Sequence, residues 1–600
     1  MSYPDSPPAY TEAAKNTVGG SSTEKKEPTF VIGVDFGTTF SSVIWTHSSC
    51  PDMPPQAVQQ WPGQSADQVP TELQYTNAST SSYIWGYQIK PTARQAVAPL
   101  KCTTKQRTPA DDTADMLTAL GVAPVTVVTH FLKSIRDTTI DAISSTILGQ
   151  EFIRQSKMLW VLTIPAIWSD MAKNLMIEAA ENAGFGRHRE DFHFVSEPEA
   201  GAVYTLATMP PQGLQIGDSF VILDCGGGTV DLITYKIRTL NPLTIDECVA
   251  GTGDLCGSVF LDQGFEKYIR GKLGDAVIDK MSARSRMHMM NSWITDVKNR
   301  FGGTTQTEFE VSVPGVADDE KMGVESGFHV MKASDVQAIF DPIIDRCIAL
   351  TRTQITSVRS QNQRVTAVLL VGGFGSSAYL RTRLLASNLS VEVLQPTNAH
   401  TAIARGALLR GLDGSIVSTH RVRRWYGCSA NDFFNSSTHD VACSLKKFWS
   451  TAEEDFLVPG YMTWYVKKND TISDTMSISF PFYRKIKTKT DTGEPNTMRE
   501  TWVFKTDLLA CDTSAPDFKW RNPGEVYTVC QLESDLSGVP KSRWQTKRAS
   551  GSEWWVVQYD LRMRMESEVL VFELVVDGKS YGAVRMRFRA GAEREVEVKN

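Results

Sequence analysis

Apolar runs of strand length recur through the first two thirds of the chain, and each ends at or near a charged residue, glycine or proline. Phe30–Asp35, Met158–Pro165, Phe220–Leu223 and Ala367–Val371 are runs of this kind. A run that is apolar on both faces of a strand is typical of a sheet that is covered on both sides. The pattern therefore predicts several buried strands before residue 412.

A helical pattern follows Pro165, and it begins after a candidate capping residue, Ser169 or Asp170. The apolar positions predicted to share one face of this helix are Leu175, Met176, Ala179 and Ala183. Strand-like and helix-like stretches alternate over residues 29–412, so we expect an α/β architecture with covered sheets.

After Gly411 the pattern changes to a period of two, as in Ile478, Phe480 and Phe482, which alternate with polar residues or proline. Asp577-Gly578 between two strand-like runs predicts a β-hairpin. We therefore expect residues 413–600 to form a separate β-rich domain with helical periodicity only around Ser444–Glu454. Residues 1–28 contain one large aliphatic residue and are predicted to be a disordered tail.

The composition is that of an ordinary globular protein. Among 600 residues, 41% are hydrophobic and 22% are charged, and the net charge is -6. These values exclude a wholly disordered, collagenous or coiled-coil chain and argue against a large nucleic-acid interface. No apolar run is long enough to predict a membrane span or a signal peptide. The ten cysteines include no CxxC pair, which predicts reduced thiols in the cytoplasm, with the nucleus as an alternative.

One local pattern occurs twice: a buried strand, an aspartate, a glycine-bearing turn and a threonine. The first copy is residues 31–39 and the second is residues 221–229. The alternative interpretation is two ordinary hairpin turns at strand ends, and a single copy would favour it. Two copies, with a further glycine pair after a buried strand at Gly372-Gly373, favour two related lobes that face one nucleotide. No Walker A sequence, GxxxxGK[ST], is present.

The residue types of the repeated pattern suit phosphate chemistry. Glycine lets the backbone turn tightly, and successive amides in such a turn bind anions. Threonine hydroxyls can donate to phosphate oxygens. The aspartates Asp35, Asp224 and Asp231 are too negative to face a phosphate directly, and they indicate a partly hydrated Mg²⁺ between carboxylates and phosphate.

Five segments in order resemble the actin, hexokinase and heat-shock ATPase superfamily, and most of all the seventy-kilodalton heat-shock proteins, in particular a divergent branch common in fungi. The segments are Gly33–Thr39, Leu162–Ala166 with Val195–Ala202, Asp224–Asp231, Val371–Ser376 and Asn398–Ala407. The resemblance covers about residues 29–412. It implies a two-lobed actin-like ATPase domain built from ribonuclease-H-like repeats, followed here by the β-rich C-terminal domain.

The resemblance also implies roles for single residues. Asp35, Asp224 and Asp231 would hold Mg²⁺, mostly through water, and Glu197 would hold the attacking water or the Mg²⁺ shell. Lys101 is the candidate for a lysine that positions the nucleophile, with Lys90 as its rival. The implied catalytic residues are Asp35, Lys101, Glu197 and Asp231. The implied nucleotide contacts are Gly37, Thr38, Thr39, Asp224, Gly226, Gly227, Gly228, Thr229, Gly257, Lys298, Gly372, Gly373, Ser376 and His400.

The sequence departs from the family pattern on the adenosine side. Lys298 is present, but Asn299 stands where an arginine of the adenine clamp is usual. Ser376 stands where an arginine usually stacks on adenine, and His400 replaces an aspartate. These departures put base recognition in question more than phosphate binding.

The resemblance therefore implies a Mg²⁺-dependent, slow ATPase of heat-shock chaperone type that binds ATP and ADP and couples nucleotide state to the C-terminal domain. By analogy its partners would be unfolded peptides or client proteins and co-chaperones, with no nucleic acid and no membrane. An alternative is a nucleotide-gated binding module or scaffold that hydrolyses little or no ATP. A small-molecule kinase of the same superfamily is a weaker alternative.

Overall fold

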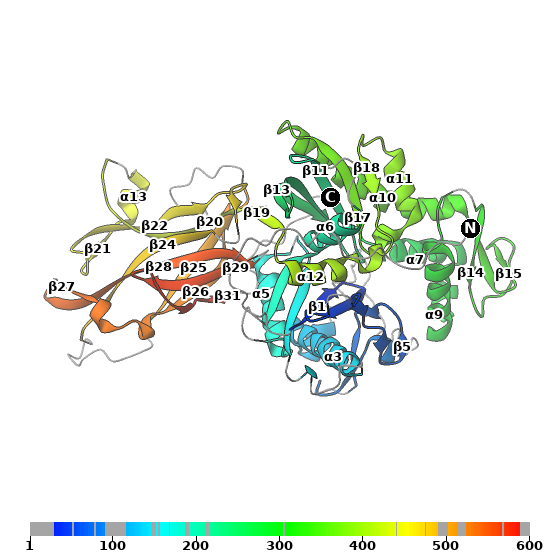
Figure 1. Cartoon of the computed structure of the whole chain (residues 1–600), viewed down its shortest axis with the longest axis horizontal. Helices are drawn as coiled ribbons and strands as arrows, with labels where there is room; N and C mark the ends of the chain where they lie inside the picture. The colour runs from blue at the N-terminus through cyan, green and yellow to red at the C-terminus, as the bar shows by residue number, and fades with distance from the viewer. Residues whose placement is uncertain are drawn as a thin grey trace.

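The structure is a computed structural model. It describes residues 29–50, 53–76, 80–89, 116–145, 152–153, 156–166, 168–186, 191–209, 215–303, 306–437, 439, 441–473, 476–489, 502–513, 524–566 and 569–588. The predicted tail at residues 1–28 and the two candidate lysines, Lys90 and Lys101, lie outside these residues. Figure 1 shows a mixed α/β part beside an elongated body of strands.

The first large sheet carries the first copy of the repeated motif. Strand β1 is antiparallel to β2 and parallel to β9, which is parallel to β10. The motif turn, residues 37–39, joins β1 to β2. In order across the sheet the strands are β10 (Phe192–Ser196), β9 (Lys157–Ile164), β1 (Thr29–Phe36), β2 (Phe40–His47) and β3 (Gln56–Ala57), with β6 (Val69–Pro70) also paired to β2.

The second large sheet repeats this arrangement around the second copy. Strand β11 is antiparallel to β12 and parallel to β17, which is parallel to β18. In order the strands are β18 (Glu392–Leu394), β17 (Val365–Val371), β11 (Ser219–Cys225), β12 (Val230–Leu240), β13 (Leu243–Asp254), β19 (Val417–Arg421) and β23 (Thr471–Ile472). Both motif turns therefore follow the equivalent strand of a sheet with the same strand order.

Helices and short strands complete the α/β part. The helices are α3 (Pro124–Ser144), α5 (Asp170–Asn182), α6 (Glu197–Thr208), α7 (Val259–Leu273), α8 (Asp275–Lys280), α9 (Ala283–Ser292), the π-helix η2 (Trp293–Lys298), α10 (Ala333–Arg359), α11 (Ala378–Ala386) and α12 (Ala402–Asp413), with 3-10 turns η1 (Gly86–Gln88), η3 (Phe374–Ser376) and η4 (Ala399–Thr401). The short strands are β4 (Gln60–Trp61), β5 (Gln64–Ser65), β7 (Leu73–Tyr75), β8 (Tyr83–Trp85), β14 (Glu308–Ser312), β15 (Val324–Glu325) and β16 (Phe328–Lys332). No helix in the described part of the chain is both long and apolar enough to cross a membrane.

Helix α5 confirms the predicted cap and corrects one predicted core position. The Ser169 hydroxyl accepts a hydrogen bond from the Ala172 amide at the helix start. Met176 is buried, but Leu175 is 36% exposed. Adjacent helical residues point about 100° apart, and here Met176 faces the core while Leu175 lies at the exposed side of the helix.

Helix α12 crosses α6 and β1 at very short range, and glycine makes this approach possible. A Cβ atom on Gly406 would lie 1.7 Å from the Ala200 carbonyl oxygen of α6. A Cβ on Gly33 of β1 would lie 2.3 Å from the Ala404 oxygen of α12. The backbones of the two helices therefore touch, and any larger residue would push them apart.

The described residues after β19 are mainly strands in two sheets, seen in yellow to red in Figure 1. One sheet has the order β21 (Phe448–Ser450), β22 (Asp455–Val466), β20 (Trp425–Phe433), β25 (Val503–Cys511), β26 (Val526–Asp535) and β31 (Arg585–Arg587). The other has the order β24 (Ser477–Lys487), β28 (Ser552–Glu566), β29 (Val569–Val576) and β30 (Lys579–Ala583), with β27 (Gln545–Ala549) also paired to β28. Two 3-10 turns, η6 (Leu536–Gly538) and η7 (Lys541–Arg543), lie between β26 and β27.

Two local predictions for this region had different outcomes. Asp577 and Gly578 have φ of 49° and 78° between β29 and β30, as a two-residue hairpin turn requires. The helical stretch predicted around Ser444–Glu454 is wrong in its extent, because α13 (Val441–Lys446) ends early. The following residues form β21 and pair with β22.

Candidate functional site

The two motif turns meet face to face. A Cβ on Gly227 would lie 2.4 Å from the Thr39 hydroxyl oxygen. A Cβ on Gly228 would lie 3.0 Å from the Thr38 methyl carbon. Because these two positions are glycine, the threonines of the first turn can reach the backbone of the second turn. The turns that contain Gly37 and Gly226 are thus brought together from opposite sheets.

A third loop, residues 257–259, is hydrogen-bonded to the second turn. The amides of Gly257, Ser258 and Val259 donate to the carbonyl oxygens of the second turn, at 3.1, 3.1 and 2.9 Å. A Cβ on Gly257 would lie 2.4 Å from the Gly227 oxygen. The Gly226 amide in turn donates to the Thr229 oxygen at 2.9 Å. The predicted contact Gly257 therefore lies against the predicted phosphate loop, and its lack of a side chain is required there.

Four carboxylates lie at the ends of the strands that flank the motif turns or at the start of α6. Asp224 on β11 is directly opposite Asp231 on β12 in the ladder. Asp35 is near the end of β1, and Glu197 is the first residue of α6. The three aspartates are buried. Thr163 of β9 donates to Asp35 Oδ1 at 3.3 Å, a partner that was not singled out from the sequence.

The four carboxylates interact electrostatically. Burial raises the pKa of Asp35 to about 7, and the Thr163 hydrogen bond opposes this rise only in part. Burial, and then the charges of the three aspartates, raise the pKa of Glu197 well above its ordinary value. Burial and the charges of Asp231 and Asp35 do the same for the pKa of Asp224. The cluster therefore needs protons or a cation to offset its negative charge.

The donor set fits Mg²⁺ held mainly through water. In the described part of the chain, no three His, Cys, Asp or Glu side chains lie close enough to ligate one ion directly. Mg²⁺ dehydrates reluctantly and usually keeps several waters, bound by one or two carboxylates and by substrate phosphates. Asp35, Asp224 and Asp231 are the residues that would hold such a hydrated ion.

The glycine pair after β17 borders the carboxylates. Gly372 has φ of +87°, and its amide donates to the Ala399 oxygen at 3.3 Å. A Cβ on Gly372 would lie 2.4 Å from Asp224 Oδ1, whereas a Cβ on Gly373 would meet no atom within 4 Å. A side chain at position 372 would therefore collide with Asp224, whereas the space beside Gly373 is open. The Ser376 hydroxyl donates to the Gly373 oxygen at 2.6 Å.

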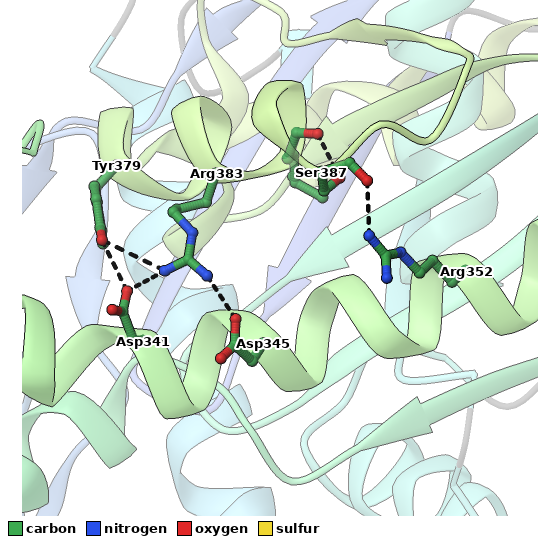
Figure 2. A network of polar contacts seen from close by, with 7 residues as sticks. Asp341, Asp345, Arg352, Tyr379, Arg383 and Ser387 are labelled. Carbon is green, nitrogen blue, oxygen red and sulfur yellow. Dashed lines mark hydrogen bonds and ion pairs between the residues drawn. The ribbon is translucent and has the colours of Figure 1, made fainter.

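An arginine holds the helix that follows this segment against α10. Figure 2 shows Arg383 of α11 between Asp341 and Asp345 of α10, with the Tyr379 hydroxyl also directed at Asp341. Arg383 Nη2 lies 2.6 Å from Asp345 Oδ1, and Tyr379 Oη lies 2.8 Å from Asp341 Oδ1. These contacts fix the position of the turn that contains Ser376.

Lys298 and His400 have partners other than the phosphate turns. Lys298 Nζ forms an ion pair with Asp262 of α7 at 2.8 Å, and the Trp293 indole also donates to Asp262 at 2.9 Å. His400 Nε2 lies 3.8 Å from Asp67 Oδ2. Asp262, the acidic partner of Lys298, was not predicted from the sequence. The residues around Asp262 indicate only that it lies in a helix. The other candidates, Lys90 and Lys101, lie outside the described residues.

Comparison with known proteins agrees with the motifs. The model of the Hsp70 protein family matches residues 99–422, more than half of the chain. The fold and the site thus define a member of a family of nucleotide-binding ATPases of chaperone-like type. The chain belongs to the Hsp70 family.

Several relatives are similar over half of the chain or more. Human heat shock 70 kDa protein 12A is 24% identical in an alignment of 515 residues that covers 71% of this chain and 75% of the relative. Human heat shock 70 kDa protein 12B is 23% identical in an alignment of 513 residues that covers 68% of this chain and 72% of the relative. A chaperone protein HscA homolog from Paracidovorax citrulli is 23% identical over 304 residues, or 50% and 43%.

Proposed function

We propose that this protein is a Mg²⁺-dependent, slowly hydrolysing ATPase of heat-shock chaperone type. In this proposal residues 29–412 form a two-lobed domain that closes on ATP or ADP, and residues 413–600 form a binding domain. The observation that carries the proposal is the contact between the two glycine turns beside the buried carboxylates. The matching strand orders of the two large sheets support the two-lobed interpretation.

The residues of the site have separate tasks in hydrolysis. Turn amides and the hydroxyls of Thr38 and Thr229 donate to phosphate oxygens. Bound Mg²⁺ supplies positive charge that offsets the charge on the phosphates and the aspartates. Glu197, whose pKa is raised, accepts a proton from water as the water oxygen attacks the γ-phosphorus. The bond from that phosphorus to the β,γ-bridging oxygen breaks, and ADP and phosphate are the products.

The C-terminal part would bind apolar, unfolded peptide segments. Exposed aromatic and aliphatic side chains recur along the chain from the end of β20 through α13 and β21 to the start of β22. They are Phe433, Leu445, Phe448, Trp449 and Phe456. Lys447 Nζ lies 4.3 Å from the ring centre of Phe434 and 5.0 Å from that of Phe456. Large exposed apolar patches often mark interaction sites. The relatives named chaperones support this choice of ligand, and co-chaperones would be further partners.

Strand β19 gives the proposal a route for coupling. It follows α12 directly and pairs in parallel with β13, in the sheet that carries the second motif turn. Its other edge pairs with β23, which lies among the C-terminal residues. A rotation of the second sheet would therefore move the first strand of the C-terminal part.

For location we propose the cytoplasm, with the nucleus as the alternative.

The experiment is calorimetric titration with ATP and ADP, with and without Mg²⁺, together with a phosphate-release assay on the same sample. Mg²⁺-dependent binding with turnover is expected. Asp35→Asn and Asp231→Asn should each lower the rate of phosphate release by about a hundredfold. Binding without turnover would favour the nucleotide-gated binding module. The ion pair between Lys298 and Asp262 supports this alternative, because Lys298, the lysine of the adenine clamp, is already paired with a carboxylate. Absence of nucleotide binding would overturn both.

A further inference from the structure

Glu199 is a fully buried carboxylate in the first turn of α6. It is 0% exposed, and its amide donates to the Ser196 hydroxyl that caps the helix, at 3.3 Å. Arg410 of α12 reaches it across the helix pair, with Nε 3.3 Å from Glu199 Oε1 and a side chain that is 16% exposed. Burial of an ionised carboxylate is unfavourable unless charged or hydrogen-bonding partners surround it. Loss of any one of these partners would therefore destabilise the buried position of the Glu199 carboxylate.

Ser415 is a second partner, and it stands at the entrance to β19. Its hydroxyl lies 3.4 Å from Glu199 Oε1 and 3.0 Å from the Val417 oxygen, and it accepts from the Val417 amide at 3.2 Å. A serine has one hydroxyl proton, so Glu199 and Val417 share it. The next residue, Ile416, accepts from the Ile245 amide of β13 at 2.8 Å. Ser415 thus contacts α6 at the point where β19 joins the second sheet.

Glu197, the proposed proton acceptor, belongs to the same helical turn as Glu199. Pro198 lies between them and fixes one backbone dihedral of that turn. Behind the turn, α6 and α12 touch at Gly406 and Ala200, where no side chain separates the backbones. A shift of Glu199 is therefore transmitted to Glu197 by a rigid, tightly packed segment.

We propose that Glu199 is a positioning residue that links the docking of β19 to the orientation of Glu197. The contact with Ser415 forms when β19 is in the sheet, and it holds the first turn of α6 in place. When β19 leaves the sheet, this contact is lost and the turn has one restraint fewer. The inference rests on the proposed function for its effect on hydrolysis, but the contact itself predicts a structural response as well.

The chain offers a matched control on the same strand. The Thr419 hydroxyl donates to Asp246 Oδ1 of β13 at 2.8 Å, so it also ties β19 to the sheet through a hydroxyl and a carboxylate. Neither residue touches α6 in these contacts. Ser415→Ala and Thr419→Val therefore both weaken the attachment of β19, but only the first removes the contact with Glu199. Ser415→Thr retains the hydroxyl and serves as the conservative rescue.

The test uses the full chain and three measurements: single-turnover ATP hydrolysis, ADP affinity by calorimetry, and hydrogen exchange of the amides at 415–421. We expect Ser415→Ala to lower the hydrolysis rate about fivefold, from loss of one hydrogen bond to a charged group. ADP affinity should stay within about twofold, because Glu197 acts on water and not on the nucleotide. Ser415→Thr should recover most of the rate. Thr419→Val should speed exchange in the same segment with little change in rate.

Two results would overturn the role of Glu199. One is a hydrolysis rate in Ser415→Ala equal to that of the wild type. The other is an equal loss in Ser415→Ala and Thr419→Val, because Thr419→Val loosens β19 only at its contact with Asp246 and leaves the Ser415 hydroxyl on Glu199. If the wild type binds nucleotide but releases no phosphate, the proposed ATPase fails, and exchange decides the inference alone. Mg²⁺–ATP must then alter exchange at 415–421 in the wild type and in Thr419→Val but not in Ser415→Ala; any other pattern rejects it.

Discussion

The phenol of Tyr426 on β20 donates a 2.8 Å hydrogen bond to Asp170 Oδ2, at the first residue of α5. This contact joins the C-terminal strands to the first large sheet's helices, 256 positions away in sequence. Tyr426 is 5% exposed, and burial with the nearby charge of Asp170 raises its pKa well above its ordinary value. The phenol therefore stays protonated and remains a donor. Arg424 adds a 2.8 Å hydrogen bond to the Tyr527 hydroxyl beside it.

Tyr426→Phe should loosen this junction. The substitution removes a buried donor to a carboxylate, and hydrogen bonds to charged groups contribute about 2 kcal/mol. We expect urea denaturation to show a lower midpoint, or a separate early transition for the C-terminal strands. Tyr483→Phe is the matched control, since Tyr483 donates to Glu453 at 3.0 Å from an exposed position. It should cost less than about 1 kcal/mol. Equal losses for the two variants would contradict a special role for the Tyr426 contact.

The stability of the Mg²⁺-free protein should fall as the pH rises. The pKa of Asp35 is about 7 in the folded chain and near 3.8 ordinarily, so the folded state binds the proton more tightly. Its stabilising contribution is complete below about pH 4 and is lost as the pH rises through 7. The loss amounts to at most about 4 kcal/mol. The other carboxylates with raised pKa values act in the same direction.

Urea denaturation between pH 5 and pH 8 in a metal chelator measures this dependence. Asp35→Asn should flatten the profile, because asparagine does not titrate, and should be more stable than the wild type at pH 8. Mg²⁺ should also flatten the dependence of stability on pH if the ion binds the ionised carboxylates. A wild-type profile that rises with pH, or one that Asp35→Asn leaves unchanged, would show that Asp35 is ionised and compensated in the folded state.

Local patterns were enough to predict the parts of the fold that depend on neighbouring residues. The two motif copies correctly predicted buried strands followed by glycine turns, because apolar runs and glycines act over a few positions. The Asp577-Gly578 turn was predictable for the same reason. The Leu175 prediction failed because a count of apolar positions does not decide which of two adjacent residues faces the core.

Contacts between distant segments were not predictable. Nothing near Lys298 in the sequence indicates that Asp262, 36 positions earlier, neutralises it. The pairing of β19 with the second large sheet was not predicted, because a five-residue strand carries no signal for the strand it will pair with. Ser415 and Glu199 are 216 positions apart, so only the fold brings them together.

Gly406→Ala should disrupt the helix crossing behind the site. A methyl group there would lie 1.7 Å from the Ala200 oxygen, a backbone atom that cannot move alone. We expect a loss of about 3 kcal/mol or failure to fold, measured as soluble yield and urea midpoint. Gly271→Ala is the control: Gly271 lies in α7 with no atom within 4 Å of the added Cβ. It should raise stability by about 0.5 kcal/mol through helix propensity. Equal behaviour of the two variants would mean that α6 and α12 are not in close contact.

Arg383→Met should weaken nucleotide binding without touching the nucleotide. The variant keeps the length of the side chain but loses the ion pairs to Asp341 and Asp345 that hold α11 on α10. Because these groups are partly exposed, we expect only about a fivefold loss of ADP affinity, by calorimetry. Arg352→Met is the matched control, since Arg352 donates to the Ser387 oxygen at 2.7 Å, beyond the far end of α11 (Figure 2). It should change affinity by less than about twofold. If Arg352→Met weakened binding as much, the network would stabilise α11 as a whole and would have no particular effect on the turn at Ser376.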